Sequence, residues 1–409
     1  MTTDAQRNYL HLFKNKNVLL LQGPVGPFFW RFSREISDLG ACVYKINFNA
    51  GDEFFYRKGT RFSGNISKLY EFLLDFIKTH EIDSVVMFGD CRPIHIEAKK
   101  VANDVGADVY VFEEGYLRPN HITLEPQGIN GHSSLSKDSR DYLFSHLDQD
   151  IQPPAVVAIG KTFWYAAAWA ILYYVAASIG RHYYPHYQHH RPLSITEAWP
   201  WVRGTARKWW FKFKERGLQK KLTTKWSNRY FLVPLQVYND FQILQHSPYQ
   251  SIETFIEEVI RSFATHAPQE TLLVLKQHPF DRGYQEYSQL IARLAKELNV
   301  VERVVYIHDQ YLPALITHAQ GVIVVNSTVG LSAVSELRPV KVCGEAIYDL
   351  PYLTVQAPLD AFWHLAPSAT PDATHVHQYM FYLTKHTQHN GSFYRRIPNS
   401  GQHCGVIWD

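Results

Sequence analysis

Two adjacent carboxylates, Glu113 and Glu114, end an apolar run and are followed at once by Gly115. On an extended segment, neighbouring side chains point to opposite sides. Only one carboxylate can therefore face a cleft, while the other can hold a backbone amide or a cation such as Arg118. A cleft carboxylate can act as a general base or attack an anomeric carbon as a nucleophile. Acids before a glycine are also common as plain turn residues, so this pair needs partners elsewhere.

A histidine provides one such partner. His278 stands at the end of another apolar run, between Lys276 and Pro279, and the proline fixes the exit of the chain. Its ring can donate a hydrogen bond to a phosphate oxygen or stabilise a leaving group, with the lysine beside it. The alternative is a histidine that only satisfies local hydrogen bonds at a strand end.

A third candidate group lies between an apolar run and a helical pattern. Asn326, Ser327 and Thr328 place hydroxyl and amide groups where a helix start attracts anions. Phosphate binding is one interpretation, and plain capping of the helix by one hydroxyl is the other. No P-loop lysine motif occurs, and the turn from Gly23 to Gly26 lacks the GxGxxG spacing, so we predict no NAD or ATP site.

All these candidates follow apolar runs that we predict to be strands. The runs alternate with segments of helical periodicity, and most are apolar on both faces, which indicates parallel sheets of the Rossmann type. The predicted strands are 17–22, 41–48, 83–89, 107–115, 229–237, 271–279, 304–308, 321–327 and 339–344. Ligands of such sheets bind outside the carboxyl ends of the strands. This rule adds Arg92, in the turn 90–93, to the candidates.

The length of 409 residues suits two domains, and 46% hydrophobic with 19% charged residues excludes intrinsic disorder. We predict an α/β chain with two Rossmann-like, doubly wound domains that face each other across a cleft, as in GT-B glycosyltransferases. Epimerases and binding proteins also contain two such halves, so the fold alone does not decide the chemistry. The predicted parts are a first domain, an intervening segment, a second domain and a tail that returns to the first domain, over 1–154, 155–225, 226–385 and 386–409.

The intervening segment has a different character. Residues 163–179 are uncharged and rich in tyrosine and tryptophan, which favours a buried or interfacial helix over a membrane span. Residues 203–225 contain nine lysines or arginines and one acid, a net charge of +8 that leaves −5 for the rest of the chain. Aromatic and basic residues alternate here, which favours contact with an anionic membrane over nucleic acid or a plain solvated helix. The predicted membrane residues are Arg207, Lys208, Trp209, Trp210, Lys212 and Lys214.

Metal binding and secretion are both disfavoured. The four cysteines, Cys42, Cys91, Cys343 and Cys404, show no CxxC spacing, and the N-terminal stretch has no signal-like apolar run. We therefore expect a cytoplasmic protein. A histidine-rich run lacks a nearby acid or cysteine, so we predict no metal there either. Its histidines are His182, His186, His189 and His190.

In four stretches the chain resembles the capsule polysaccharide biosynthesis family, and within it the KpsS-like β-Kdo transferases. These stretches are 22–40, 112–119, 276–279 and 312–354. The family resembles bacterial sialyltransferases of the GT-B class, which share an acid-acid-glycine motif, a His-Pro motif and a Ser/Thr pair. This chain matches the three motifs in order, with Glu113-Glu114-Gly115, His278-Pro279 and Ser327-Thr328.

The resemblance implies transfer of the sugar acid Kdo from CMP-Kdo to a phosphatidylglycerol-type lipid, with retention of configuration, to build the β-Kdo linker of a capsule chain. It implies Glu114 as the reacting carboxylate and Glu113 as the brace of the loop. A CMP-sugar carries one phosphate, so the site needs hydrogen-bond donors and no metal or other cofactor. The expected donor-binding residues are Lys276, His278, Pro279, Asn326, Ser327 and Thr328. Candidates for the Kdo carboxylate or the acceptor phosphate are Gly23, Gly26, Arg92 and Arg118.

The resemblance also implies where the protein works. We expect a peripheral protein at the inner face of the cytoplasmic membrane, with a second Kdo transferase and the capsule export machinery as further partners, and no nucleic acid. Two alternatives stay open. One is a transferase that uses CMP-sialic acid, and the other is a non-catalytic scaffold for capsule assembly and export.

Overall fold

The computed structural model describes residues 9–136, 155–188, 198–239, 241–398 and 400–408. The chain forms two compact units. Among the described residues, unit 1 contains 9–136, 155–188 and those from 381 onward, and unit 2 contains 198–380. The boundaries differ from the predicted ones, because the segment 155–225 is divided between the two units. Each unit is described by itself below.

Unit 1 is built on a seven-stranded sheet in the order β12-β6-β5-β4-β1-β2-β3. The strands β5, β4, β1, β2 and β3 pair in parallel, whereas β6 pairs antiparallel with β5, and β12 antiparallel with β6. The predicted parallel order holds from β5 to β3, and the antiparallel edge formed by β6 and β12 was not predicted. The loop from Glu114 to His121 is too short for the crossover that parallel strands need. The strands are β1 Asn17–Leu20, β2 Cys42–Asn47, β3 Thr60–Arg61, β4 Ser84–Phe88, β5 Asp108–Glu114, β6 His121–Pro126 and β12 Gln388–Asn390.

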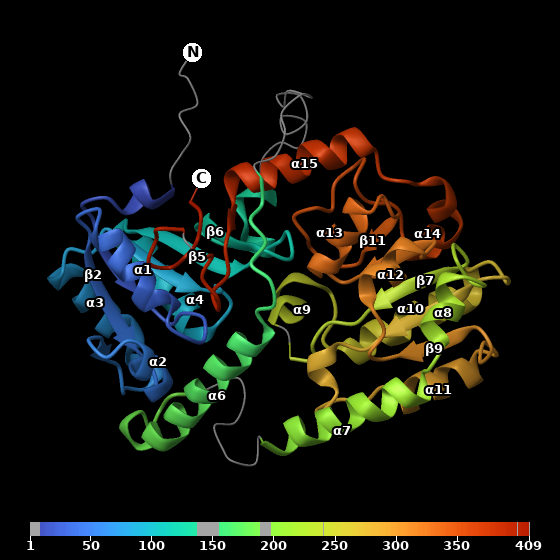
Figure 1. Cartoon of the computed structure of the whole chain (residues 1–409), viewed down its shortest axis with the longest axis horizontal. Helices are drawn as coiled ribbons and strands as arrows, with labels where there is room; N and C mark the ends of the chain where they lie inside the picture. The colour runs from blue at the N-terminus through green and yellow to red at the C-terminus, as the bar shows by residue number, and fades with distance from the viewer. Residues whose placement is uncertain (1–8, 137–154, 189–197, 240, 399, 409) are drawn as a thin grey trace. The chain divides into compact units, whose positions relative to one another are not determined.

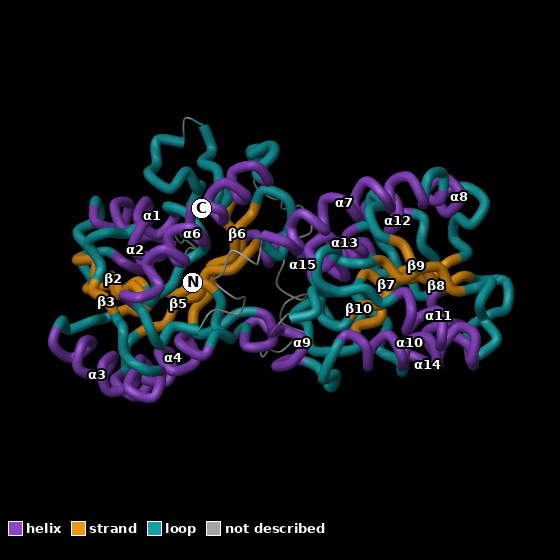
Figure 2. The backbone as a smooth tube through the Cα atoms, turned by 90° about the horizontal axis from the view of Figure 1, so that it is seen from below, coloured by secondary structure: helices purple, strands orange, loops and turns teal. Residues whose placement is uncertain are grey.

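Helices cover both faces of this sheet (Figure 2). On one face α1 packs with Phe112 and with apolar residues of the C-terminal segment, and on the other α3 and α4 pack with Val111. Because side chains alternate along β5, the strand contributes residues to two separate cores, one on each face of the sheet. The helices are α1 Phe28–Ser37, α2 Ala50–Phe55, α3 Leu69–Thr79, α4 Pro93–Val105 and α6 Phe163–Ile179, with 3₁₀ turns η1 Tyr9–Phe13, η2 Ile66–Lys68, η3 Asn130–His132, η4 Ser134–Ser136 and η5 Gly180–Tyr183.

Unit 2 is built on a five-stranded, fully parallel sheet in the order β11-β10-β7-β8-β9. Its strands are β7 Tyr230–Pro234, β8 Leu272–Lys276, β9 Val304–Ile307, β10 Gly321–Val324 and β11 Val340–Val342. A core under one face joins the sheet to α10, α11 and α14 (Figure 2). The helices are α7 Ala198–Lys214, α8 Leu218–Thr223, α9 Phe241–His246, α10 Ile252–His266, α11 Ser288–Glu297, α12 Leu312–Thr317, α13 Thr328–Ser335 and α14 Leu359–Leu365, with η7 Pro279–Asp281 and η8 Ala366–Ser368. Helix α15, Ala373–His386, leads from unit 2 back into unit 1 (Figure 1).

The strand order reverses at one point in each sheet. In unit 1 the reversal lies between β1 and β4, and in unit 2 it lies between β7 and β10. Doubly wound sheets bind ligands outside the carboxyl ends of the strands at such points. The predicted α/β class, with two Rossmann-like domains of the GT-B type, is confirmed by these two sheets.

Candidate functional site

The paired glutamates are the last two residues of β5 in unit 1. The phenol of Tyr394, from the C-terminal segment, donates to Glu114 Oε1 over 2.8 Å. Glu113 points the other way. Its Oε1 accepts from the N–H of Glu114 at 3.0 Å, and its Oε2 lies next to Gly89 at the end of β4, 3.5 Å from where a Cβ on that glycine would stand. The two carboxylates therefore lie on opposite sides of β5, as predicted.

Their surroundings also differ electrostatically. Burial raises the pKa of Glu113 to about 7, and the charge of Glu114 adds to this effect, while Arg118 and Arg92 oppose it. Burial, with Glu114 beside it, holds the pKa of the Tyr394 phenol well above its usual value, so the phenol stays a donor. A carboxyl group with a pKa raised in this way can exchange a proton near neutral pH.

Arg92 is held at the reversal point of the sheet. It stands at the N-terminus of α4 and donates from Nη1 to Gln22 Oε1 over 2.7 Å. The amide of Gln22 in turn donates to the hydroxyls of Tyr187 at 2.9 Å and Tyr173 at 3.1 Å. Gln22 was not among the predicted site residues, although it is the polar residue that directly follows the apolar run of β1. The same rule that selected Arg92 would have found it.

The glycine turn after β1 is packed by aromatic rings. A Cβ on Gly23 would lie 2.8 Å from the ring of Phe29, and a Cβ on Gly26, whose φ is +111°, would lie 3.1 Å from Trp169 of α6. Close packing thus accounts for both glycines, and their predicted contact with the sugar carboxylate or acceptor phosphate stays a prediction. Arg118 is exposed and is anchored by a bond of 3.0 Å from Nε to the carbonyl of Gly115, in the loop after β5.

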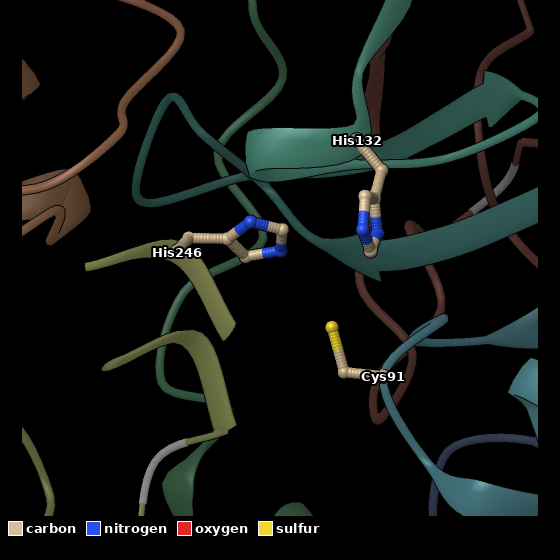
Figure 3. A group of neighbouring side chains, drawn as sticks. All are labelled: Cys91, His132 and His246. Atoms are coloured by element: carbon tan, nitrogen blue, oxygen red, sulfur yellow. The ribbon is translucent and has the colours of Figure 1, made fainter. Parts of the chain in front are cut away.

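A further polar group follows β4. The buried carboxylate of Asp90 lies 3.0 Å from Nδ1 of His132 and 3.4 Å from Sγ of Cys91. Figure 3 shows the Cys91 and His132 side chains directed toward one another, with Sγ and a ring nitrogen within 4.8 Å. His246, also drawn in Figure 3, belongs to unit 2.

In unit 2, the His-Pro pair follows the buried strand β8. Nδ1 of His278 accepts a hydrogen bond from the N–H of Phe280 at 3.2 Å, so in the neutral ring Nε2 carries the hydrogen and acts as the donor. Pro279 begins η7 and sets the direction in which the chain leaves the strand. Lys276 is buried, which lowers its pKa, while the charge of Asp309 opposes this effect.

The polar group after β10 lies at the reversal point of the same sheet. Asn326 Oδ1 accepts from Nε2 of Gln236 at 2.9 Å, and Gln236 follows the central strand β7. Ser327 is the N-cap of α13 and accepts from the N–H of Val329 at 3.2 Å, while Thr328 is the first helical residue. The capping interpretation of Ser327 is thus confirmed. Gln236 was missed by the sequence analysis, although it occupies the same place after β7 as Gln22 does after β1.

Helix α7 exposes most of the predicted membrane residues. The side chains of Lys208, Trp209, Trp210, Lys212 and Lys214 are all exposed. Arg207 is different. Its Nη1 donates to the carbonyl of Arg282 over 2.8 Å and lies 3.9 Å from Glu286, so the guanidinium is directed into unit 2. Arg207 is thus held within unit 2, and its predicted contact with a membrane stays a prediction. Of the histidine-rich run, His189 and His190 lie outside the described residues.

The structure thus gathers the predicted residues into two sets. Arg92, Glu113, Glu114 and Arg118 meet at the carboxyl edge of the sheet in unit 1. Lys276 ends β8 and His278 follows it, and the Asn326 to Thr328 group follows β10, all at the carboxyl edge of the sheet in unit 2. The first set offers a carboxylate that exchanges protons near neutral pH. The second offers a lysine, an imidazole, a hydroxyl and helix-start amides, which are groups that bind phosphate.

These two sets lie on an α/β chain of two units. The chain belongs to the capsule polysaccharide biosynthesis protein family, whose match covers residues 83–394. Its relatives include the capsule polysaccharide export protein KpsS of Escherichia coli, which is 38% identical over 94% of this chain and 98% of that protein. The capsule polysaccharide modification protein LipB of Neisseria meningitidis is 40% identical over 97% of both chains. Among solved structures, the β-Kdo 2,7 transferase KpsC of Thermosulfurimonas dismutans matches 94% of both chains, with 15% identity and a TM-score of 0.46.

Proposed function

We propose that the chain is a glycosyltransferase that moves Kdo from CMP-Kdo to a phosphatidylglycerol-type lipid and so starts or extends the β-Kdo linker of a capsular polysaccharide. The observation that carries the proposal is the position of the Glu113 carboxylate at the carboxyl edge of the unit 1 sheet, in a member of this family. Burial there raises the pKa of Glu113 to about 7. A base with that pKa is matched to the activation of a hydroxyl near neutral pH.

The environment of the two glutamates leads us to exchange their predicted roles. Glu114 is engaged by Tyr394 and holds the C-terminal segment against β5, which is a bracing role. Glu113, beside Gly89 and near Arg92, is the better candidate to meet the substrate. In an inverting reaction it would take the proton of the acceptor hydroxyl. In the retaining reaction that the resemblance implies, it would attack the anomeric carbon.

The residues of unit 2 would bind the donor. Nε2 of His278 would donate to the single phosphate of CMP and stabilise the leaving group, aided by the charge of Lys276. The start of α13, with Ser327 and Thr328, would supply further donors. Because CMP-Kdo carries one phosphate, the proposed reaction needs neither a metal nor another cofactor.

The proposed place of work is the inner face of the cytoplasmic membrane, where the exposed lysines of α7 would meet anionic headgroups. A second Kdo transferase and the capsule export machinery are the further proposed partners. Two other functions remain as outcomes of the test. They are transfer from CMP-sialic acid, whose phosphate would use the same residues, and a scaffold without catalysis.

One experiment separates these functions. The purified chain is incubated with CMP-Kdo or CMP-sialic acid and a fluorescent phosphatidylglycerol analogue, and the lipid product is weighed by mass spectrometry. The proposal predicts a mass gain of one or more Kdo units with CMP-Kdo, retained in the presence of EDTA. A gain only with CMP-sialic acid, loss of transfer with EDTA, or no gain with either donor would each overturn the corresponding part of it.

A further inference from the structure

Helix α6 presents two opposite faces, and both are apolar. One face packs on unit 1, with the side chains of Tyr173 and Ala177 buried and Gly180 packed against Ala50. Figure 1 shows α6 running beside α2 in unit 1. The helix has no charged residue along its 17 positions. Its other face therefore cannot be the polar, solvated side that a helix on the surface of a unit normally has.

The outward face is a stripe of large apolar side chains. The exposed fractions are 74% for Trp164, 63% for Ile171, 50% for Val175 and 73% for Ile179. These residues follow one another at spacings of seven and four, so they lie on one side of the helix. Soluble surfaces rarely leave such a continuous apolar patch uncovered. The outward stripe, defined as these four residues, thus requires an apolar environment.

The composition along the helix indicates what that environment is. On the outward side of the helix, Phe163, Trp164 and Tyr165 stand at the first turn and Tyr183 follows the last, with the aliphatic residues of the stripe between them. The rings of Trp169 and Tyr173, in the middle of the helix, bond toward unit 1 instead. The exposed cations Lys161 and Arg181 flank the two ends. On this outward side, aromatic rings at the ends, aliphatic side chains in the middle and flanking cations form the pattern of a segment at the lipid–water interface.

The segment Phe163–Tyr183 is long and apolar enough to cross a membrane by length and composition. Its inward face argues against crossing. The hydroxyl of Tyr173 accepts from Asn49 at 2.6 Å and donates to Asp52 at 3.0 Å, inside the polar cluster that also holds Gln22. Nε1 of Trp169 donates to the carbonyl of Tyr394 over 3.1 Å. A spanning helix would have to break all these contacts.

We infer that α6 is an in-plane membrane helix that keeps its inward face on unit 1 and inserts the outward stripe into the apolar edge of a lipid leaflet. This inference deepens the membrane location in the proposed function, but it rests on different residues and does not depend on the sugar donor. Contact through α6 is hydrophobic, so it persists at high salt, whereas attraction through the lysines of α7 is screened.

The test measures flotation of the full chain with vesicles of neutral phosphatidylcholine in about 0.5 M NaCl, where surface charge is screened. No donor is present, so failure of the proposed transfer reaction cannot affect the result. We expect the wild-type chain to float. The variant with Ile171→Ser, Val175→Ser and Ile179→Ser should bind at least roughly tenfold more weakly. The matched control replaces three exposed aliphatic residues elsewhere, Ile66, Ile96 and Val301, by serine and should bind like wild type.

A second measurement does not depend on the triple variant. Vesicles with brominated acyl chains should quench part of the tryptophan fluorescence, and Trp164→Phe should remove most of that quenching. Wild type that stays in solution with neutral vesicles would overturn the inference, as would a triple variant that floats fully or quenching that Trp164→Phe leaves unchanged. Light scattering that shows a wild-type dimer, and a monomer for the triple variant, would also overturn the inference, because a second copy of the chain would then cover α6.

Discussion

Glu113 and Glu114 are chemically identical, yet the structure gives them different surroundings. Tyr394 donates to Glu114, whereas Glu113 accepts from the backbone N–H of Glu114. Burial dominates at Glu113 and favours its neutral form. One substitution series can therefore separate the reacting carboxylate from the bracing one.

We predict that Glu113→Gln lowers kcat for transfer by about 10² to 10⁴, the usual contribution of a positioned acid or base. Glu114→Gln retains a group that can accept from Tyr394, so its loss should be smaller. In wild type, kcat/KM should rise with pH through a midpoint near the Glu113 pKa of about 7 and level off above it, because the carboxyl must lose its proton to react. Initial rates between about pH 5 and 9 check this limb.

The outcome that contradicts this assignment is the reverse order of the two variants. If Glu114→Gln abolishes turnover and Glu113→Gln retains it with the same pH limb, Glu114 is the reacting carboxylate. Circular dichroism and urea midpoints of both proteins serve as the folding control.

At His278, we predict that substitution by alanine weakens CMP binding by roughly 10- to 100-fold, since hydrogen bonds that involve a charged partner contribute about 1.5–3 kcal/mol. Calorimetric titration with CMP measures the loss. His364→Ala, which replaces an exposed histidine on α14 of the same unit, is the matched control and should bind normally. Unchanged CMP affinity in His278→Ala would remove His278 from the donor site.

At the scale of elements, the surface helix α6 is linked by hydrogen bonds to the carboxyl edge of the unit 1 sheet. Tyr173 of α6 bonds to Gln22, and Gln22 bonds to Arg92. On the same side, Trp169 bonds to the backbone of Tyr394, whose phenol holds Glu114. Arg92 and Glu114 are thus each linked to α6 through one intermediate residue.

We predict that Tyr173→Phe destabilises unit 1 by about 1–3 kcal/mol, because it leaves buried amide donors and a carboxylate without one partner. Urea denaturation measures this cost. If the hydrogen bonds from Tyr173 through Gln22 position the guanidinium of Arg92, KM for the substrate that Arg92 contacts should rise more than kcat falls. Tyr165→Phe is the control, since Tyr165 is exposed on the same helix. Equal stability and kinetics in Tyr173→Phe would show that the cluster does not position the arginine.

Helix α7 is predicted to act by charge. Replacing Lys208, Lys212 and Lys214 by glutamine should weaken binding to vesicles that contain phosphatidylglycerol by about 1 kcal/mol per lysine at low salt, and the difference should vanish at high salt. Arg207 is left in place because it bonds within unit 2. Glutamine at the exposed Lys58, Lys78 and Lys296 is the matched control. Equal losses in both triple variants would mean that only net charge matters.

At the scale of the whole molecule, much of the fold was predictable because apolar periodicity is a local signal. The strands β1, β4, β5, β7, β8 and β10 and the polar turns after them follow from it. Antiparallel β6 and β12 were missed, because β12 is a three-residue polar strand that forms only where the C-terminal segment returns. Tyr394 was missed for the same reason, since 280 residues separate it from Glu114 and no spacing rule relates them. The bond of Arg207 to unit 2 was not predicted, because charge in a sequence does not reveal which group a side chain contacts.

The returning C-terminal segment completes the core of unit 1. Phe393 is buried among aromatic rings, 4.8 Å from Phe28 and 5.1 Å from Phe88 between ring centroids, and it immediately precedes Tyr394. A side chain in this position supports both the stability of unit 1 and the bond to Glu114.

We therefore predict that Phe393→Ala destabilises unit 1 by about 3–5 kcal/mol, the cost of a cavity left by a buried phenylalanine. Because Phe393 also fixes the backbone of Tyr394, transfer should fall even where the variant remains folded. The control Phe280→Ala, at an exposed ring, should leave the urea midpoint unchanged. Urea unfolding followed by tryptophan fluorescence, with transfer rates measured below the transition, checks both effects. A Phe393→Ala protein as stable as wild type would show that the C-terminal segment lies on unit 1 without completing its core.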